Sequence, residues 1–258
     1  MGRIFANDYY DAVNGADTDD REGFTRVTAG GLIEPAQVRR ATVLTFGLAV
    51  LVGTYLVFVG GAPTVVIGVS SIAAGVLYTG GPYPYGYYGL GDLFVFVFFG
   101  LVAVTGTYYV QAVSTVAAGP LPLGVPAGTV TVDGVLAGGA VGALATGILV
   151  VNNIRDRETD SEAGKRTLAV LLGYRLSRLE YVGLLALAYV VPLVFWARGY
   201  GLPVLAPLIT VPLATLPART VLSRTDGDAL NPALERTGQL LALYAVLFAL
   251  GLTVPGVV

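Results

Sequence analysis

Residues 133–167 read DGVLAGGAVGALATGILVVNNIRDRETDSEAGKRT, an apolar run that turns abruptly into a charged one. Positions 133–153 hold a single charged residue, Asp133, and as a helix they are long enough to cross the roughly 30 Å of hydrocarbon in a bilayer. Eight of the next fourteen residues are charged, with acids and bases interleaved. The stretch therefore predicts a membrane-spanning helix that ends in a polar segment at the membrane surface.

The composition of the whole chain indicates an integral membrane protein. Hydrophobic residues fill 55% of the 258 positions, only 12% are charged and the mean hydropathy is +0.73, whereas about a quarter of the residues in soluble domains are charged. Between residues 41 and 154 the only charged side chains are Asp92 and Asp133, which we expect to cap the helices that begin there. Lipid must cover most of this part of the chain.

Seven apolar stretches are long enough to span a membrane, which predicts an all-α, polytopic helix bundle with seven full transmembrane helices and a partial N-terminal helix. Gly60, Gly61 and Pro63 separate the first two, and residues 117–131 are too rich in Pro and Gly to be helical. The predicted spans are 38–60, 62–80, 92–117, 133–153, 179–197, 202–222 and 237–256.

Basic residues predict the orientation of the bundle. Lys and Arg cluster before the first span, between the fourth and fifth, and between the sixth and seventh, at 21–40, 155–178 and 219–236. By the positive-inside rule these segments face the cytoplasm. Because four spans separate residues 7–26 from 152–167, both segments emerge on the same side. We expect a multi-pass protein of the cell membrane whose active site faces the cytoplasm.

These two segments carry spaced acids. On a helix, residues three and four apart share a face, so Asn7, Asp8 and Asp11 form one stripe and Asn152, Asp156 and Asp160 another, with Asn153 beside it and Asp17 after the first. Acids in a polar turn usually only solvate it, but acids this close to an apolar helix are costly and typically functional. Paired clusters of oxygen ligands suit Mg²⁺, which takes its remaining ligands from water and substrate phosphates. We therefore predict metal ligation by Asn7, Asp8, Asp11, Asp17, Asp156 and Asp160, with the catalytic roles at Asp8, Asp11, Asp156 and Asp160.

Other side chains on the same face extend the predicted site. Phosphate oxygens would be bound by the bases Arg26, Lys165 and Arg166 and by the amides Asn7, Asn152 and Asn153, although topology alone also explains the bases. The loop YTGGPYPYGYYGLGD (78–92) holds five tyrosines, whose rings can stabilise a cation. Histidine and cysteine are absent, so no thiolate or imidazole takes part.

A membrane bundle with metal-binding acids at one mouth fits a substrate with a diphosphate head and a hydrocarbon tail. Mg²⁺ and basic side chains would stabilise the leaving diphosphate, where negative charge develops. Exclusion of water would protect the allylic cation until an aromatic acceptor attacks it. We expect these two substrates and the lipid bilayer as partners, and no nucleic acid.

At this point the sequence resembles a known family. NDYYDAVNGADT (7–18), REGFTR (21–26), GLIEPAQVRRA (31–41) and NNIRDRETDSEAGKRTLAVLLG (152–173) are similar to the paired aspartate motifs of the UbiA superfamily of intramembrane prenyltransferases. LYTGGPYPYGYYGLGDLFVFVFFG (77–100) and LNPALERTGQL (230–240) resemble its 1,4-dihydroxy-2-naphthoate polyprenyltransferase branch. The resemblance runs from about Ile4 to the C-terminus.

The resemblance implies a nine-helix bundle and Mg²⁺-dependent transfer of a polyprenyl chain to the naphthoate, with decarboxylation, giving demethylmenaquinone in menaquinone biosynthesis. It assigns the first metal–diphosphate to Asn7, Asp8 and Asp11 and the second to Asp156 and Asp160. Lys165, Arg166 and Arg26 fall where the family places basic residues. Residues 1–258 would form a single transmembrane prenyltransferase domain that lacks the first family helix and most of the second, and we expect a missing segment before Met1.

Three alternatives remain at this point. Other members of the superfamily prenylate other acceptors, and a chain without the first helices would be an inactive fragment. An ion transporter is the alternative from a different class. Transporter sites usually lie near the bilayer midplane on broken helices, whereas the acids of this chain collect at one face.

Overall fold

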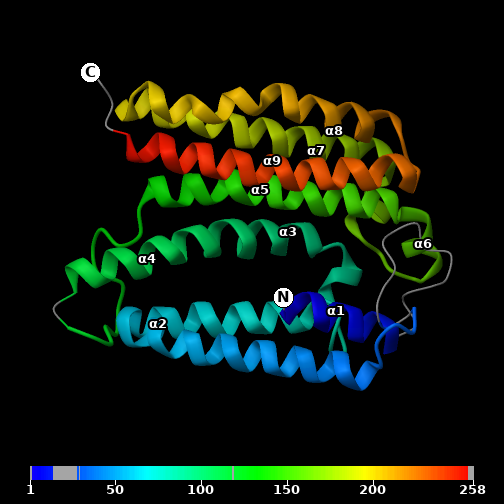
Figure 1. The fold of residues 1–258 in the computed structure, drawn as a ribbon, viewed down its shortest axis with the longest axis horizontal. Helices are drawn as coiled ribbons and strands as arrows, with labels where there is room; N and C mark the ends of the chain where they lie inside the picture. The colour runs from blue at the N-terminus through cyan, green and yellow to red at the C-terminus, as the bar shows by residue number, and fades with distance from the viewer. Residues whose placement is uncertain (1, 14–27, 29, 118, 255–258) are drawn as a thin grey trace.

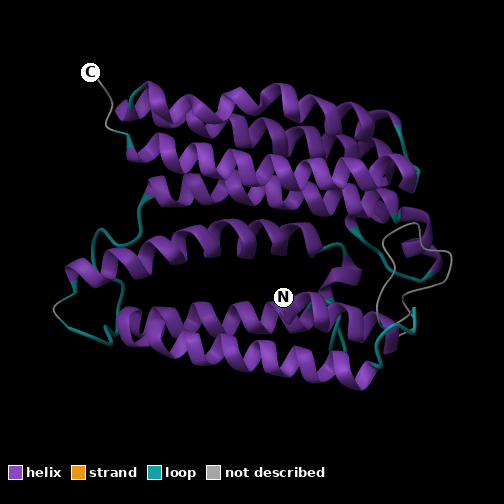
Figure 2. Cartoon of the chain, in the orientation of Figure 1, coloured by secondary structure: helices purple, strands orange, loops and turns teal. Residues whose placement is uncertain are grey.

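The computed structural model describes residues 2–13, 28, 30–117 and 119–254, and this part of the chain is built from helices without a single strand (Figures 1 and 2). The all-α prediction is confirmed. The α-helices are α1 (Gly2–Val13), α2 (Pro35–Leu77), α3 (Gly91–Val95), α4 (Ala103–Val116), α5 (Val132–Arg155), α6 (Arg157–Glu162), α7 (Leu168–Phe195), α8 (Val211–Ser223) and α9 (Gly227–Thr253). Tighter or wider turns occupy Tyr85–Tyr88, Phe96–Val102, Trp196–Tyr200 and Leu202–Thr210.

Six helical stretches of the described residues are long and apolar enough to cross a membrane. The first of them, α2, has 43 residues and would measure roughly 64 Å if straight, twice the hydrocarbon thickness. It breaks at Gly61, whose φ of 65° and ψ of −151° are not helical, and Figure 1 shows two arms that meet there. When each arm is counted as one span, the seven predicted spans are all present.

Helix α5 forms the centre of the bundle. Ala140, Ala143 and Leu144 are fully buried, and α5 packs against α7, α9 and the Phe96–Val102 turn. Small residues permit the last contact, because a Cβ at Gly100 would lie 2.3 Å from the Cα of Gly142. The charged end of α5 is thereby fixed relative to three neighbouring segments.

The two acids that we expected to cap helices form contacts with other segments instead. Thr131 caps α5 by accepting a hydrogen bond from Gly134 N at 3.0 Å. Asp133 instead accepts one from Tyr200 Oη at 2.7 Å and pairs with Arg198 at 2.9 Å. Asp92 lies inside the first turn of α3 and makes no cap bond there. The cap predictions were wrong because each acid lies inside its helix and bonds to another segment.

Candidate active site at the polar end of the bundle

A cavity of about 470 Å³ opens at the end of the bundle where α1, the tyrosine loop and the C-terminal end of α5 meet. Both acidic stripes reach it: its polar lining includes Asn7, Asp11, Asn152, Asp156, Asp160 and Lys165. Val95, Phe99, Ile148 and Leu241 form part of an apolar wall. Segments separated by about 140 residues thus supply one site with a polar mouth and an apolar interior.

The first stripe lies on α1, which packs against α2. Asp11 is 3% exposed and accepts a hydrogen bond from Tyr87 Oη. Asn7 Oδ1 accepts a bond from Thr79 Oγ1 at 3.1 Å. Asp8, also buried, accepts bonds from the backbone N–H and hydroxyl of Thr28 and does not line the cavity. Of the predicted first cluster, Asn7 and Asp11 reach the cavity.

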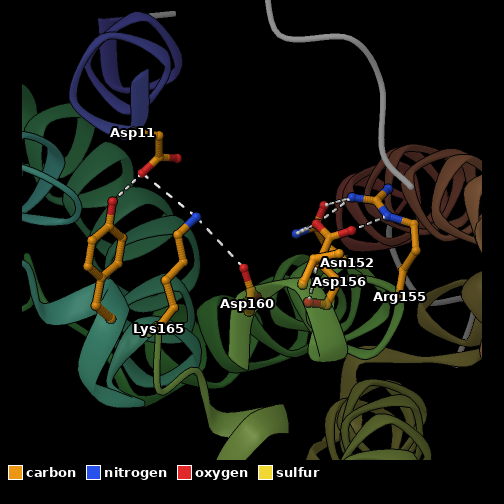
Figure 3. A network of polar contacts seen from close by, with 8 residues as sticks. Asp11, Asn152, Arg155, Asp156, Asp160 and Lys165 are labelled. Atoms are coloured by element: carbon orange, nitrogen blue, oxygen red, sulfur yellow. Dashed lines mark hydrogen bonds and ion pairs between the residues drawn. The ribbon is translucent and has the colours of Figure 1, made fainter. Parts of the chain in front are cut away.

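The second stripe is organised around Arg155. Its guanidinium donates from Nε and Nη2 to the two carboxylate oxygens of Asp156, both at 2.7 Å. Nη2 also reaches Asn152 Oδ1 at 2.8 Å, and Nη1 reaches Asn231 Oδ1 at 2.8 Å. Two-point contacts of this kind fix a carboxylate in orientation as well as in charge. Through Asn152 and Asn231, Arg155 therefore connects Asp156 to α5 and to α9. Figure 3 shows the contacts of Arg155 with Asp156 and Asn152.

Lys165 joins the two stripes. Its Nζ lies 4.0 Å from Asp11 Oδ1 and 3.7 Å from Asp160 Oδ1, between the two carboxylates (Figure 3). The same nitrogen lies 5.3 Å from the centre of the Tyr87 ring. Lys165 is 8% exposed, so a buried cation occupies the space between one acid of each stripe.

The remaining predicted residues are distributed unevenly. Asn153 lines the cavity and donates from Nδ2 to Asp92 Oδ2 at 3.5 Å. Arg166 is exposed and its side chain does not line the cavity, although its backbone N–H donates to Tyr87 O at 2.9 Å. Asp17 and Arg26 lie outside the described residues.

Sequence reasoning missed three side chains of this site. Arg155 and Asn231 escaped notice because their bond links positions 76 residues apart, although Asn231 belongs to the LNPALERTGQL motif singled out above. Tyr87 belongs to the loop at 78–92, where the high number of tyrosines indicated a role in the site. The spacing of these tyrosines did not distinguish Tyr87 from its neighbours. The structure separates them: Tyr87 contacts Asp11, whereas Tyr83 and Tyr88 are exposed.

The donor set suits a hard divalent cation bound together with phosphate. The polar groups that reach the cavity offer carboxylate and amide oxygens, which Mg²⁺ prefers. No group of three or more acids gathers around one point within the part of the chain that the structure describes. Mg²⁺ does not require such a group, since one or two carboxylates suffice when water and phosphate oxygens complete its shell. The position of Lys165 shows that a positive charge is accommodated between Asp11 and Asp160.

Several known proteins are similar to this chain along most of its length. The chain is 39% identical over 249 residues to the 1,4-dihydroxy-2-naphthoate octaprenyltransferase of Mycobacterium tuberculosis, covering 96% of this chain and 79% of that protein. It is 38% identical over 264 residues to the Escherichia coli protein of the same name, with 96% and 78% covered. Human UbiA prenyltransferase domain-containing protein 1 is 32% identical over 253 residues, with 95% and 67% covered.

A solved structure, described as digeranylgeranylglyceryl phosphate synthase in membranes, shares the fold. Its TM-score is 0.58 at 13% identity, with 98% of this chain and 81% of that chain covered. Residues 2–244 match the UbiA prenyltransferase family. The chain therefore belongs to the UbiA prenyltransferase family and is a multi-pass membrane enzyme that transfers prenyl groups.

Proposed function

We propose that this enzyme transfers a polyprenyl group from polyprenyl diphosphate to 1,4-dihydroxy-2-naphthoate, with loss of the carboxylate as CO₂, in menaquinone biosynthesis. The observation that carries the diphosphate half of the proposal is the convergence of Asp11, Asp156, Asp160 and Lys165 on one cavity. The names of the relatives from M. tuberculosis and E. coli support the naphthoate as acceptor.

The chain's own residues would act first on the diphosphate head. Lys165 contributes a positive charge at the mouth, where the phosphate oxygens gain charge as the allylic C–O bond breaks. Asp11, Asp156 and Asp160, with the amides of Asn7 and Asn152, would hold Mg²⁺, which supplies further neutralisation of the leaving group when bound. Asp8 and, outside the described residues, Asp17 and Arg26 remain predicted members of this set.

The apolar wall would receive the tail and exclude water. Val95 and Phe99 line the main cavity and also a second cavity of about 270 Å³, which is lined in addition by Phe94 and Phe98. The aromatic side chains that line the two cavities suit a hydrocarbon chain and would shield the developing allylic cation. Tyr87, whose hydroxyl donates to Asp11 and whose ring centre lies 5.3 Å from Lys165 Nζ, would hold both side chains in position for the head group.

We also propose the cellular setting and the domain organisation. The bases between α5 and α7 and between α8 and α9 support a position of the cavity on the cytoplasmic side of the cell membrane. Residues 1–258 would act as a single transmembrane prenyltransferase domain.

A transfer assay tests the proposal. Purified protein in lipid nanodiscs would receive octaprenyl diphosphate and Mg²⁺, with either 1,4-dihydroxy-2-naphthoate or 4-hydroxybenzoate as acceptor. We expect a prenylated, decarboxylated naphthoate product that disappears with EDTA, and at least a tenfold preference for the naphthoate. Equal or faster transfer to 4-hydroxybenzoate would reject the acceptor, and transfer unaffected by EDTA would reject the metal.

A further inference from the structure

The hydroxyl of Thr167 is buried and has no hydrogen-bond partner among the described residues. The residue is only 8% exposed. A buried hydroxyl that lacks a partner is costly. Thr167 also lines the main cavity. The unused donor therefore lies at the wall of the proposed diphosphate site.

The position of Thr167 at the start of α7 makes the missing bond more informative. Thr167 precedes the first turn of α7, which opens with a short helical segment that breaks at Gly173 (φ 74°, ψ 170°), and a threonine in this position ordinarily accepts a hydrogen bond from an amide of that turn. Its side chain makes no such cap bond. The hydroxyl is therefore available to a ligand in the cavity that Thr167 lines.

The backbone leading to Thr167 is held from two directions. Lys165 N donates to Asp160 O at 2.8 Å, and Arg166 N donates to Tyr87 O at 2.9 Å. The Lys165 side chain, two residues before Thr167, lies between Asp11 and Asp160 in the same cavity. Thr167 is thus held two residues from a buried cation that lines the same cavity.

We propose that Thr167 Oγ1 donates a hydrogen bond to an oxygen of the substrate diphosphate, which Lys165 binds in the same cavity. This inference rests on the proposed function and extends it, because it assigns a further binding contact to the same diphosphate head group. The ligand satisfies the hydroxyl, and this explains why an unpaired donor is retained inside the cavity wall.

The test uses inorganic pyrophosphate with Mg²⁺ as the probe and compares Thr167→Val with Thr167→Ser in the full chain. Valine keeps the volume but removes the hydroxyl, and serine keeps the hydroxyl. Pyrophosphate affinity would be measured by calorimetry, and stability by the thermal unfolding midpoint without ligand. Ser177→Ala is the matched control, because Ser177 lies on the same helix, is fully buried, has no partner for its Oγ among the described residues and is outside the cavity lining.

We expect Thr167→Val to weaken pyrophosphate binding about tenfold while its unfolding midpoint stays equal to or above that of the wild type. Thr167→Ser and Ser177→Ala should bind like the wild type. Wild-type affinity in Thr167→Val, an equal loss in Thr167→Ser, or a lowered unfolding midpoint in Thr167→Val would each overturn the inference. The pyrophosphate binding assay contains no acceptor, so it tests the Thr167 inference without testing transfer. If the wild-type protein binds pyrophosphate but transfers no prenyl group to the naphthoate, the proposed function is refuted and the inference about Thr167 is not.

Discussion

Asp156 depends on its neighbour in the sequence. The Arg155 and Asp156 side chains are both nearly inaccessible, at 2% and 3% exposure, and the two-point contact between them neutralises a charge that would otherwise be costly to bury. Lysine would keep the charge but not the planar fork that reaches Asp156, Asn152 and Asn231 together. Arg155 therefore determines where the Asp156 carboxylate points into the cavity.

Replacing Arg155 by Lys should reduce both stability and turnover. We expect the free energy of unfolding to fall by about 1–3 kcal/mol, less than for complete loss of a buried pair. We also expect the Mg²⁺ concentration that gives half-maximal transfer to rise, because Asp156 loses its fixed orientation. Thermal unfolding and a Mg²⁺ titration of the transfer rate measure the two effects.

The neighbouring Arg157→Lys is the control for this prediction. Arg157 pairs with the exposed Glu158 and lies outside the cavity lining, so its replacement should leave the Mg²⁺ titration unchanged. An Arg155→Lys enzyme with a wild-type Mg²⁺ titration would show that Arg155 does not orient Asp156 for catalysis.

Spacing along a helix made some site residues predictable and left others hidden. Asn7 and Asp11, and likewise Asn152 and Asp156, are four residues apart, so a single helical turn predicts that they share a face, and both pairs line the cavity. Tyr87 reaches Asp11 and Arg155 reaches Asn231, each across 76 residues of sequence, and Thr167 is distinguished by a missing bond. No local pattern encodes such relations, so the structure was needed to find them.

At the scale of the helices, the predicted N-terminal boundaries were wrong where charged residues lie within a helix. We placed the fifth span at 179–197 and the seventh at 237–256, whereas α7 begins at Leu168 and α9 at Gly227. Charged residues interrupt the apolar pattern of each helix without interrupting the helix itself. They are Arg175 and Arg178 in α7, and Asp228, Glu235 and Arg236 in α9. Arg178 donates to Val221 O at 2.9 Å and to Arg224 O at 3.0 Å, where free carbonyls at the end of α8 need donors. The hydropathy pattern predicts only the part of a helix that lies in the hydrocarbon, whereas the helix itself continues past the membrane surface.

The break in α2 was predictable from Gly60, Gly61 and Pro63, but its contact partner was not. Gly61 has a φ of 65° and a ψ of −151°, a backbone region that essentially only glycine adopts. A Cβ there would lie 1.8 Å from Pro122 O, and Ala62 N donates to that same oxygen at 3.0 Å. The loop at 117–131 is thereby fastened to the turn between the two arms.

Gly61→Ala should destabilise the protein by about 2–4 kcal/mol, from backbone strain and displacement of the loop. Gly53→Ala and Gly68→Ala, one in each arm, are matched controls, because a Cβ at either meets nothing within 4 Å. Their unfolding midpoints should equal or exceed that of the wild type. If Gly61→Ala unfolds at the same temperature as these controls, the break does not require glycine.

At the scale of the whole molecule, the bundle has a polar end, which holds the candidate site, and an opposite end where loops connect the helices. Figure 1 shows α6 at one end and the connection between α4 and α5 at the other. Four spans separate the two acidic stripes in the sequence, and the even number brings both stripes to the same end. By the positive-inside rule we predict that this end faces the cytoplasm.

Labelling of single cysteines tests this orientation directly, since the chain has no native cysteine. Ser161→Cys lies on the exposed side of α6, and Leu123→Cys replaces a side chain that is 90% exposed in the opposite loop. In intact cells a membrane-impermeant maleimide should label Leu123→Cys only, and in inverted vesicles Ser161→Cys only. The reverse pattern would place the active site on the outer face.

The central claim is that acids from two distant segments serve one diphosphate through divalent ions. The most direct measurement is the Mg²⁺-dependent transfer rate of purified Asp11→Asn and Asp156→Asn, compared with Glu162→Gln, an exposed acid from the same polar segment that lies outside the cavity lining. The account predicts that each of the first two loses transfer by about a thousandfold or more while Glu162→Gln retains it. Wild-type rates in both aspartate variants would contradict the account.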